Sequence, residues 1–266
     1  MKRSNAKSFL QPREYKEIDF DSVEASEKAI EIMRTKKCLH DVYVEKYRLL
    51  MKEAVKNLKL SSDSKILEIG SGGGFIKDIF PNVITSDIKP LSNIDIIINA
   101  ERLPFDDNEL GAIFAVHTIH HIPDIDSFLQ EATRVLKSGG GMVCIEPYWG
   151  LVARFLYKNL HPEPFDEKAA EWNLTEPSGP MSGSNQALSY IMLKRDRALF
   201  LKKHQPFEII RSKRFGFIRY FCTGGIWLNQ ILPDFCFPFL KVIEVALKPF
   251  MPLLAIHHVF ILRKRL

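Results

Sequence analysis

The stretch ILEIGSGGGF, residues 66–75, gathers four of the chain's fourteen glycines directly after a short apolar run. A glycine turn between a parallel strand and the next helix brings backbone N–H groups and the positive end of a helix dipole beside a ligand. Dinucleotide-binding turns have the spacing G-x-G-x-x-G. Counted from Gly70, that spacing requires glycine at position 75, where this chain has Phe75. The observed spacing, E-x-G-x-G-x-G from Glu68, therefore predicts a different ligand.

A second chemical feature is Asp87, which ends the predicted strand NVITSDI. A carboxylate at this point of an α/β unit can accept hydrogen bonds from both hydroxyls of a ribose. Nicotinamide-cofactor sites carry such an acid too, so Asp87 indicates a nucleoside without deciding which one.

Three histidines, His117, His120 and His121, follow the predicted strand AIFAVHT, at the edge where open α/β sheets bind ligands. One of them could act as a general base; the alternative is a hydrogen-bonded histidine that fixes the loop. Glu146, which ends the strand MVCIEP, has the same two interpretations. We take His117, His121 and Glu146 as catalytic candidates. No metal is expected, because no carboxylate or cysteine is spaced to complete a site with the histidines.

The scaffold for these residues is predicted from the alternation of strand and helix patterns over 65–147, which is typical of βαβ units and a parallel sheet. The predicted strands are 65–69, NVITSDI, IDIIINA, AIFAVHT and MVCIEP. FIKDIF is predicted to begin a helix. DIDSFLQEATRVLK is predicted to be an amphipathic helix, capped by glycines 139–141 with positive φ.

Helical patterns precede this core over 21–58, with apolar stripes of Ala29, Ile30 and Met33 and of Tyr47, Leu50, Met51, Ala54 and Val55. After residue 147 the regular alternation of strand and helix patterns ends. The chain shows a helical pattern at 151–160, the motif HPEPFD with His161, Glu163 and Asp166, a long helix at about 186–203, one or two strands over 207–220, an apolar segment at 224–255 and a final strand from 257.

We therefore expect four parts: N-terminal helices (1–60), a ligand-binding core (61–147), a helical insertion that caps the substrate (148–206), and final strands with an apolar helical insertion (207–266). Residues 1 to about 20 are polar and are expected to be frayed.

The glycine turn, Asp87, INAERLPFDDNEL and AVHTIHHIPDIDSFLQEATRVLKSGGGMVCIEP, in this order, resemble the class I S-adenosylmethionine-dependent methyltransferases, above all the broad group that includes the quinone-biosynthesis methyltransferases. The resemblance covers about 65–147. It implies an α/β fold with a doubly wound, Rossmann-like, mostly parallel seven-stranded sheet whose last strand is antiparallel. It also implies S-adenosylmethionine as the methyl donor.

Position by position, the resemblance implies a cofactor site. Glu68 would lie near the cofactor's amino group, Asp87 would bind the ribose hydroxyls, and His117 would lie under the sulfonium. The turn residues Gly70, Ser71, Gly72 and Gly74 would approach the methionine half, Ile88 would lie against the adenine, and Asn99 and Ala100 would lie at the adenine edge. The family commonly has aspartate where this chain has Asn99. An amide can donate as well as accept, so a contact to adenine is kept.

The charge pattern bears on the methyl acceptor. Nine Lys or Arg against two acids between Lys194 and Arg219 give this segment a net charge of +7, above the +5 of the whole chain. Such a segment suits a phosphorylated substrate, a membrane surface or nucleic acid; the alternative is a solvated helix face and strand edge. The apolar segment 224–255 is either a lid over the sheet or a peripheral membrane contact.

Three function classes follow from these observations. The first is a methyltransferase acting on a small-molecule, lipid-linked or sugar acceptor by in-line displacement. The second is an RNA or protein methyltransferase, which the basic segment supports and the lack of a recognised nucleic-acid motif opposes; DNA is not expected, and RNA stays open. The third is a non-catalytic S-adenosylmethionine-binding interaction protein. The N-terminus lacks the apolar core of a signal peptide, and the four cysteines lack metal or disulfide spacing, so we expect a cytoplasmic or membrane-peripheral protein.

Overall fold

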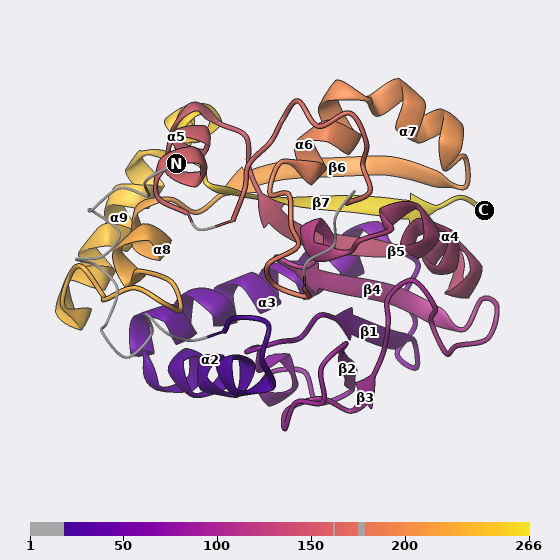
Figure 1. Ribbon diagram of the computed structural model, residues 1–266, viewed down its shortest axis with the longest axis horizontal. Coiled ribbons are helices and arrows are strands. Elements are labelled where there is room, and N and C mark those ends of the chain that lie inside the picture. Colours follow the sequence, from indigo (N-terminus) through magenta and orange to yellow (C-terminus); the bar gives the residue numbers. More distant parts are fainter. Residues whose placement is uncertain (1–18, 162, 175–178) are drawn as a thin grey trace.

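A seven-stranded sheet forms the centre of the computed structural model, which describes residues 19–161, 163–174 and 179–266. The strand order is β3-β2-β1-β4-β5-β7-β6 (Figure 1). The strands are β1 (Lys65–Ile69), β2 (Val83–Asp87), β3 (Ile96–Ile97), β4 (Leu110–Val116), β5 (Leu136–Pro147), β6 (Phe207–Phe215) and β7 (His257–Lys264). All pairs are parallel except those of β7 with β5 and β6. The predicted doubly wound, mostly parallel sheet with an antiparallel last strand is confirmed. The expectation for residues 1 to about 20 lies almost wholly outside the described residues.

Both faces of the sheet are apolar, so its central strands are continuous hydrophobic runs. In β4, Phe114 belongs to the core on one face, whereas its neighbours Ile113 and Ala115 belong to the core on the other. This alternation follows from the two-residue period of a strand. Each face therefore needs its own layer of helices.

The first layer is N-terminal. Helix α2 (Val23–Thr35) begins where the Ser22 hydroxyl accepts a hydrogen bond from the Ala25 N–H, and its predicted stripe is buried. Helix α3 (Lys37–Asn57) packs Tyr47, Leu50 and Ala54 against the sheet. Val55 was wrongly predicted to belong to the buried stripe of α3: it is 67% exposed, because it lies on the solvent-facing side of the helix.

The second layer contains α4 (Ile125–Val135), whose Asp124 cap accepts from the Ser127 N–H at 3.0 Å. Its apolar side joins the core with α5 (Leu151–Asn159), α6 (Leu188–Tyr190) and α7 (Arg197–Lys203). The single long helix predicted over 186–203 was wrong: it is interrupted at Asp196, after a π-helical turn. The Asp196 carboxylate accepts from the Trp172 indole N–H and from Arg195.

The predicted glycine cap of α4 was also wrong. The helix ends at Val135, and β5 begins at once with Leu136. Only Gly139 has a positive φ, +80°. A Cβ at Gly141 would lie 2.3 Å from the Leu262 carbonyl oxygen, and one at Gly140 would lie 2.6 Å from that of Gly111. These two glycines thus permit close approach of neighbouring strands.

The predicted helix at FIKDIF is reduced to a single 3₁₀ turn, Ile76–Asp78. Few residues separate Gly74 from Pro81, and a nucleus that short gains too few hydrogen bonds to extend as an α-helix. The side chains of Phe75 and Ile76 are instead buried against the N-terminal helices. The third predicted strand is likewise only two residues long.

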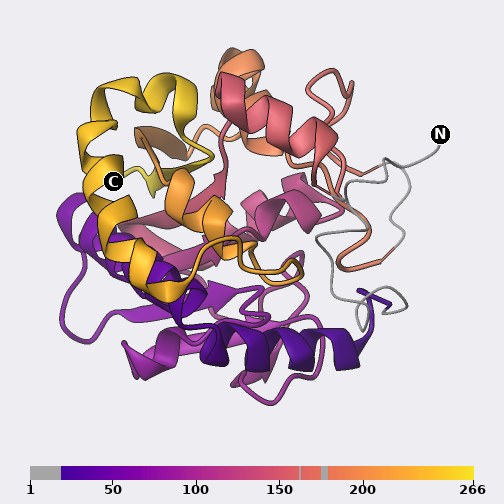
Figure 2. The ribbon, with the colours of Figure 1, turned by 90° about the vertical axis from the view of Figure 1, so that its left-hand side faces the viewer.

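The C-terminal part departs from the sheet after β6. Gly216, with φ +67°, ends the strand, and α8 (Ile218–Thr223) follows, so 207–220 forms one strand and one helix. Helices α9 (Phe237–Ala246) and α10 (Met251–Leu254) lead to β7. Figures 1 and 2 show α8 and α9 grouped beyond one end of the sheet, beside α3. None of the helices within the described residues has the length and apolarity needed to cross a bilayer.

Candidate active site

The glycine turn follows β1 and is held in a conformation that requires glycine. Gly70 and Gly72 have φ of +59° and +46°, the left-handed region that side chains disfavour. A Cβ at Gly70 would lie 2.2 Å from Thr118 Cγ2, and one at Gly74 would lie 2.4 Å from the Tyr47 hydroxyl. At these two positions the turn is packed against Thr118, just after β4, and against Tyr47 of α3, and it leaves no space for a side chain.

Asp87 lies beside this turn, as predicted from its place at the end of β2. Its Oδ2 accepts the Gly72 N–H at 2.9 Å, and its Oδ1 accepts the Lys89 N–H at 3.0 Å. The Asn93 amide donates to the carbonyl oxygens of Gly72 and Gly74 at 2.9 and 2.7 Å. Asn93 was missed in the sequence, because an asparagine in a surface loop gives no signal of its own.

Three further predicted residues lie next to Asp87. Ile88 is 52% exposed, although it directly follows a buried strand. Asn99 is exposed, and Ala100 is half-buried against the core. The Ile98 N–H donates to the Asp87 carbonyl oxygen at 2.9 Å, which brings this segment alongside the end of β2.

Glu68 is buried beneath the turn, with 2% of its surface exposed. Burial and the nearby Asp87 carboxylate, opposed by Ser71, raise the pKa of Glu68 to about 8. Its Oε2 has no hydrogen-bond partner among the residues that the structure describes. A buried polar oxygen without a partner is uncommon in folded proteins, and this one is open to a donor from water or from a bound molecule.

His117 begins the loop after β4 with a left-handed backbone, φ +55°. Its Nε2 lies 2.9 Å from Nζ of Lys46, a fully buried lysine of α3. The Lys46 nitrogen lies 4.3 and 4.2 Å from the ring centroids of Tyr43 and Tyr220. Burial lowers the pKa of Lys46 well below its usual value, and burial together with Lys46 lowers that of His117. Burial thus disfavours the charged form of both groups. Lys46 was missed because it lies in a helical pattern 71 positions before His117.

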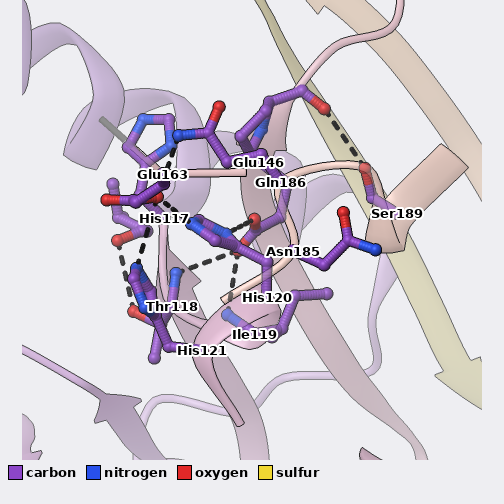
Figure 3. Close-up of polar contacts among 12 residues, drawn as sticks. His117, Thr118, Ile119, His120, His121, Glu146, Glu163, Asn185, Gln186 and Ser189 are labelled. Atoms are coloured by element: carbon purple, nitrogen blue, oxygen red, sulfur yellow. Dashed lines mark hydrogen bonds and ion pairs between the residues drawn. The ribbon is translucent and has the colours of Figure 1, made fainter. Parts of the chain in front are cut away.

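Glu146 and His120 form a buried pair (Figure 3). Glu146 Oε1 accepts the N–H groups of Thr118 and Ile119 at 2.9 and 3.0 Å, and Oε2 lies 2.5 Å from His120 Nδ1. Burial opposes the charged imidazole, but the carboxylates of Glu146 and Glu163 raise the pKa of His120 to about 10. Both oxygens of Glu146 are occupied, so its geometry favours holding the loop and His120 in place.

The insertion contributes Glu163, which lies against both histidines (Figure 3). Its Oε2 is 3.2 Å from His120 Nε2 and 3.7 Å from His121 Nε2. His120 lowers the pKa of Glu163, although burial alone would raise it. Burial and His120 lower the pKa of His121 to about 4. Asp166 instead lies at the surface, where its N–H and carbonyl oxygen bond the Asn185 side chain.

Known proteins resemble both the core and the whole chain. A family model described as "Methyltransferase domain" matches residues 67–144. The ubiquinone/menaquinone biosynthesis C-methyltransferase UbiE of Rickettsia prowazekii is 30% identical over 62% of this chain and 73% of its own length. This chain belongs to the class I S-adenosylmethionine-dependent methyltransferases. The UbiE protein of Brucella canis is 44% identical, but over 51% of this chain and only 48% of its own length.

A solved structure agrees with the fold of this methyltransferase. The PH0226 protein of Pyrococcus horikoshii is 14% identical, covers 96% of this chain and 99% of its own, and gives a TM-score of 0.51. The methyltransferase uses S-adenosylmethionine as methyl donor. Two features of the glycine turn suit such a molecule: Glu68 has a buried carboxyl oxygen without a hydrogen-bond partner among the described residues, and a Cβ added at Gly70 or Gly74 would collide with Thr118 or Tyr47.

Proposed function

We propose that the methyltransferase holds S-adenosylmethionine along the edge formed by the glycine turn and the end of β2. Asp87 accepts hydrogen bonds from the ribose hydroxyls, and Ile88 packs on the adenine, whose edge meets Asn99 and Ala100. The turn residues Gly70, Ser71, Gly72 and Gly74 contact the methionine half. The unpartnered oxygen of Glu68 carries this assignment, because it needs a donor and the cofactor's amino group supplies one.

Methyl transfer would occur beside His117. A lone pair of the acceptor forms the bond to the methyl carbon, and the carbon–sulfur bond breaks with its electron pair staying on sulfur. Aligning acceptor, methyl and sulfur is worth roughly 7–11 kcal/mol.

A base is needed only for acceptors that lose a proton, such as a phenol or a sugar hydroxyl. Among the described residues of the site, the Lys46–His117 pair has the properties of such a base. Its pKa values are lowered by burial, and the two groups cannot both be charged 2.9 Å apart. We assign the proton to this pair, in which Lys46 Nζ lies 2.9 Å from His117 Nε2. His121 and Glu146 then position the loop.

The acceptor we propose is a small molecule carried on a lipid. Helices α9 and α10 and the turns beside them leave large apolar side chains in solvent: Phe235, Phe239, Val242, Val245, Phe250 and Leu253. Exposed basic residues lie next to these apolar side chains and line a shallow hollow: Arg211, Lys213 and Arg214 of β6 on one side, and Lys248 on the other. An apolar surface with a basic border is the pattern of a protein that rests on an anionic membrane. The relatives named for ubiquinone and menaquinone biosynthesis are consistent with such an acceptor.

The basic segment gives less support to an RNA acceptor than its charge alone indicated. Three of its nine basic residues form ion pairs within the described structure: Arg195 with Asp196, Lys203 with Asp126, and Arg219 with both Glu45 and Glu244. These partners neutralise charge that phosphate contacts would otherwise use. The other exposed basic residues fall in two groups: Arg211, Lys213 and Arg214 on β6, next to the apolar surface, and Lys194, Arg197 and Lys202 on α7 and the turn before it.

Two experiments test the acceptor. Cell extract is incubated with the protein and methyl-labelled S-adenosylmethionine, then fractionated; label is expected in the lipid fraction, and label confined to RNA or protein would contradict the proposal. In flotation with vesicles containing anionic lipid, the wild type is expected to float. Phe239→Asp with Phe250→Asp is expected to remain in solution, because these side chains are 69% and 56% exposed on the proposed contact. Leu199→Asp, on α7, is the matched exposed control.

A further inference from the structure

The two adjacent histidines and Glu163 bring three metal-ligating atoms together at the mouth of the site. Nε2 of His120, Nε2 of His121 and a carboxylate oxygen of Glu163 all lie within 4.8 Å of one another. Bonds of about 2.0–2.2 Å to a tetrahedral zinc ion separate its ligand atoms by about 3.3 Å. The two histidine–carboxylate separations, 3.2 and 3.7 Å, are close to that value.

Hydrogen bonds from surrounding residues fix the orientation of these side chains, as is usual for metal-binding histidines. His120 Nδ1 bonds the Glu146 carboxylate at 2.5 Å, and His121 Nδ1 lies 3.2 Å from the Gly183 carbonyl oxygen. Both contacts place a proton on Nδ1 and leave Nε2 of each ring directed at Glu163. The Gln186 amide donates to Glu163 Oε2 at 2.8 Å. A carboxylate or carbonyl on the far nitrogen is what metal-bound histidine usually has.

We propose that His120, His121 and Glu163 bind a divalent transition-metal ion, with zinc as the ion these ligands suit best. Two imidazoles and one carboxylate are the protein ligands of an open zinc site, which keeps a further position for water or for an oxygen of a bound molecule. The expectation of no metal rested on spacing along the sequence, and Glu163 comes from 42 positions beyond His121. The ion would tie the insertion to the end of β4.

The competing interpretation is a plain chain of ion pairs, Glu146–His120–Glu163, with no metal. The contacts of His120 suit both. His121 distinguishes them, since the ion-pair chain does not require its Nε2 to face the same carboxylate oxygen.

The test measures metal directly and does not depend on the proposed acceptor. The full chain is stripped with a chelator, mixed with Zn²⁺, gel-filtered and analysed for bound zinc; Co²⁺ then replaces zinc and its visible absorption reports tetrahedral coordination. About one ion per chain is expected. Glu163→Gln and His121→Gln are each expected to weaken zinc affinity by at least about 100-fold, since loss of an outer partner alone costs 10–100-fold. Glu171→Gln, exposed in the same insertion, is the control.

Circular dichroism verifies that each variant is folded, and His120 is left intact because it is fully buried. The proposal is overturned if the wild type retains neither ion, or if folded Glu163→Gln and His121→Gln bind zinc as tightly as the control does.

Discussion

Replacing Asp87 by alanine tests the cofactor site most directly. The carboxylate closes the glycine turn through Gly72 and, in the proposed complex, accepts two hydrogen bonds from the ribose. Hydrogen bonds to a charged group contribute about 1.5–3 kcal/mol each. Taking the lower value for both, the loss of about 3 kcal/mol weakens binding by about 100-fold.

The same change also affects folding, and the two effects need separating. Asp87 accepts backbone N–H groups of Gly72 and Lys89, and each such bond to a charged group contributes about 1.5–3 kcal/mol. With the lower value for both bonds, the melting temperature is expected to fall by roughly 6–12 °C. Asp95→Ala is a matched control, because Asp95 accepts the Thr85 N–H of the same strand at 2.9 Å and pairs with Lys77, away from the turn.

Calorimetry with S-adenosylmethionine, at a temperature where both variants are folded, measures the outcome. Asp87→Ala should lose affinity by about 100-fold, whereas Asp95→Ala should lose stability alone. Equal affinities in Asp87→Ala and the wild type would refute the assignment of the ribose to Asp87, whatever the stabilities.

Two further variants probe the turn and the buried lysine. Gly70→Ala should lower the free energy of unfolding, measured in urea, by more than Gly225→Ala. Both glycines have positive φ, which costs a substituted residue about 1–2 kcal/mol, but only at Gly70 does the new Cβ collide with Thr118. Equal losses would contradict the close packing at Gly70. Burial lowers the pKa of Lys46 well below 10.5, its value in the unfolded chain. Between the folded and the unfolded pKa values the unfolded chain binds more protons, so stability rises with pH. Lys46→Met removes this titration and the cost of burying the amine. It should therefore be more stable than the wild type, show a smaller rise in stability towards alkaline pH and transfer no methyl to a hydroxyl acceptor; an unchanged pH slope would contradict the lowered pKa of Lys46.

Local signals predicted the parts of the core in which side-chain period and turn chemistry agree. The strands β1, β2 and β4, the N-terminal helices and the final strand follow apolar patterns and were located to within about two residues. By contrast, β3 is shorter than predicted, and β5 begins at Leu136, before its predicted start at Met142. The glycines were harder, because the same residue serves for positive φ and for close approach. Gly70 adopts a positive φ. Gly141, in β5, instead permits the close approach of the Leu262 carbonyl oxygen, a contact that the sequence does not reveal.

The sequence by itself determined that the chain has an α/β methyltransferase core, since the glycine turn, Asp87 and the order of strands are all local features. The tertiary structure decided which distant side chains complete the site. Lys46 meets His117 across 71 positions and Glu163 meets His120 across 43. Such pairs form because a parallel sheet brings the carboxyl ends of its strands to one edge, where α3 and the insertion converge. Sequence spacing carries no information on contacts that are made only after that sheet has formed.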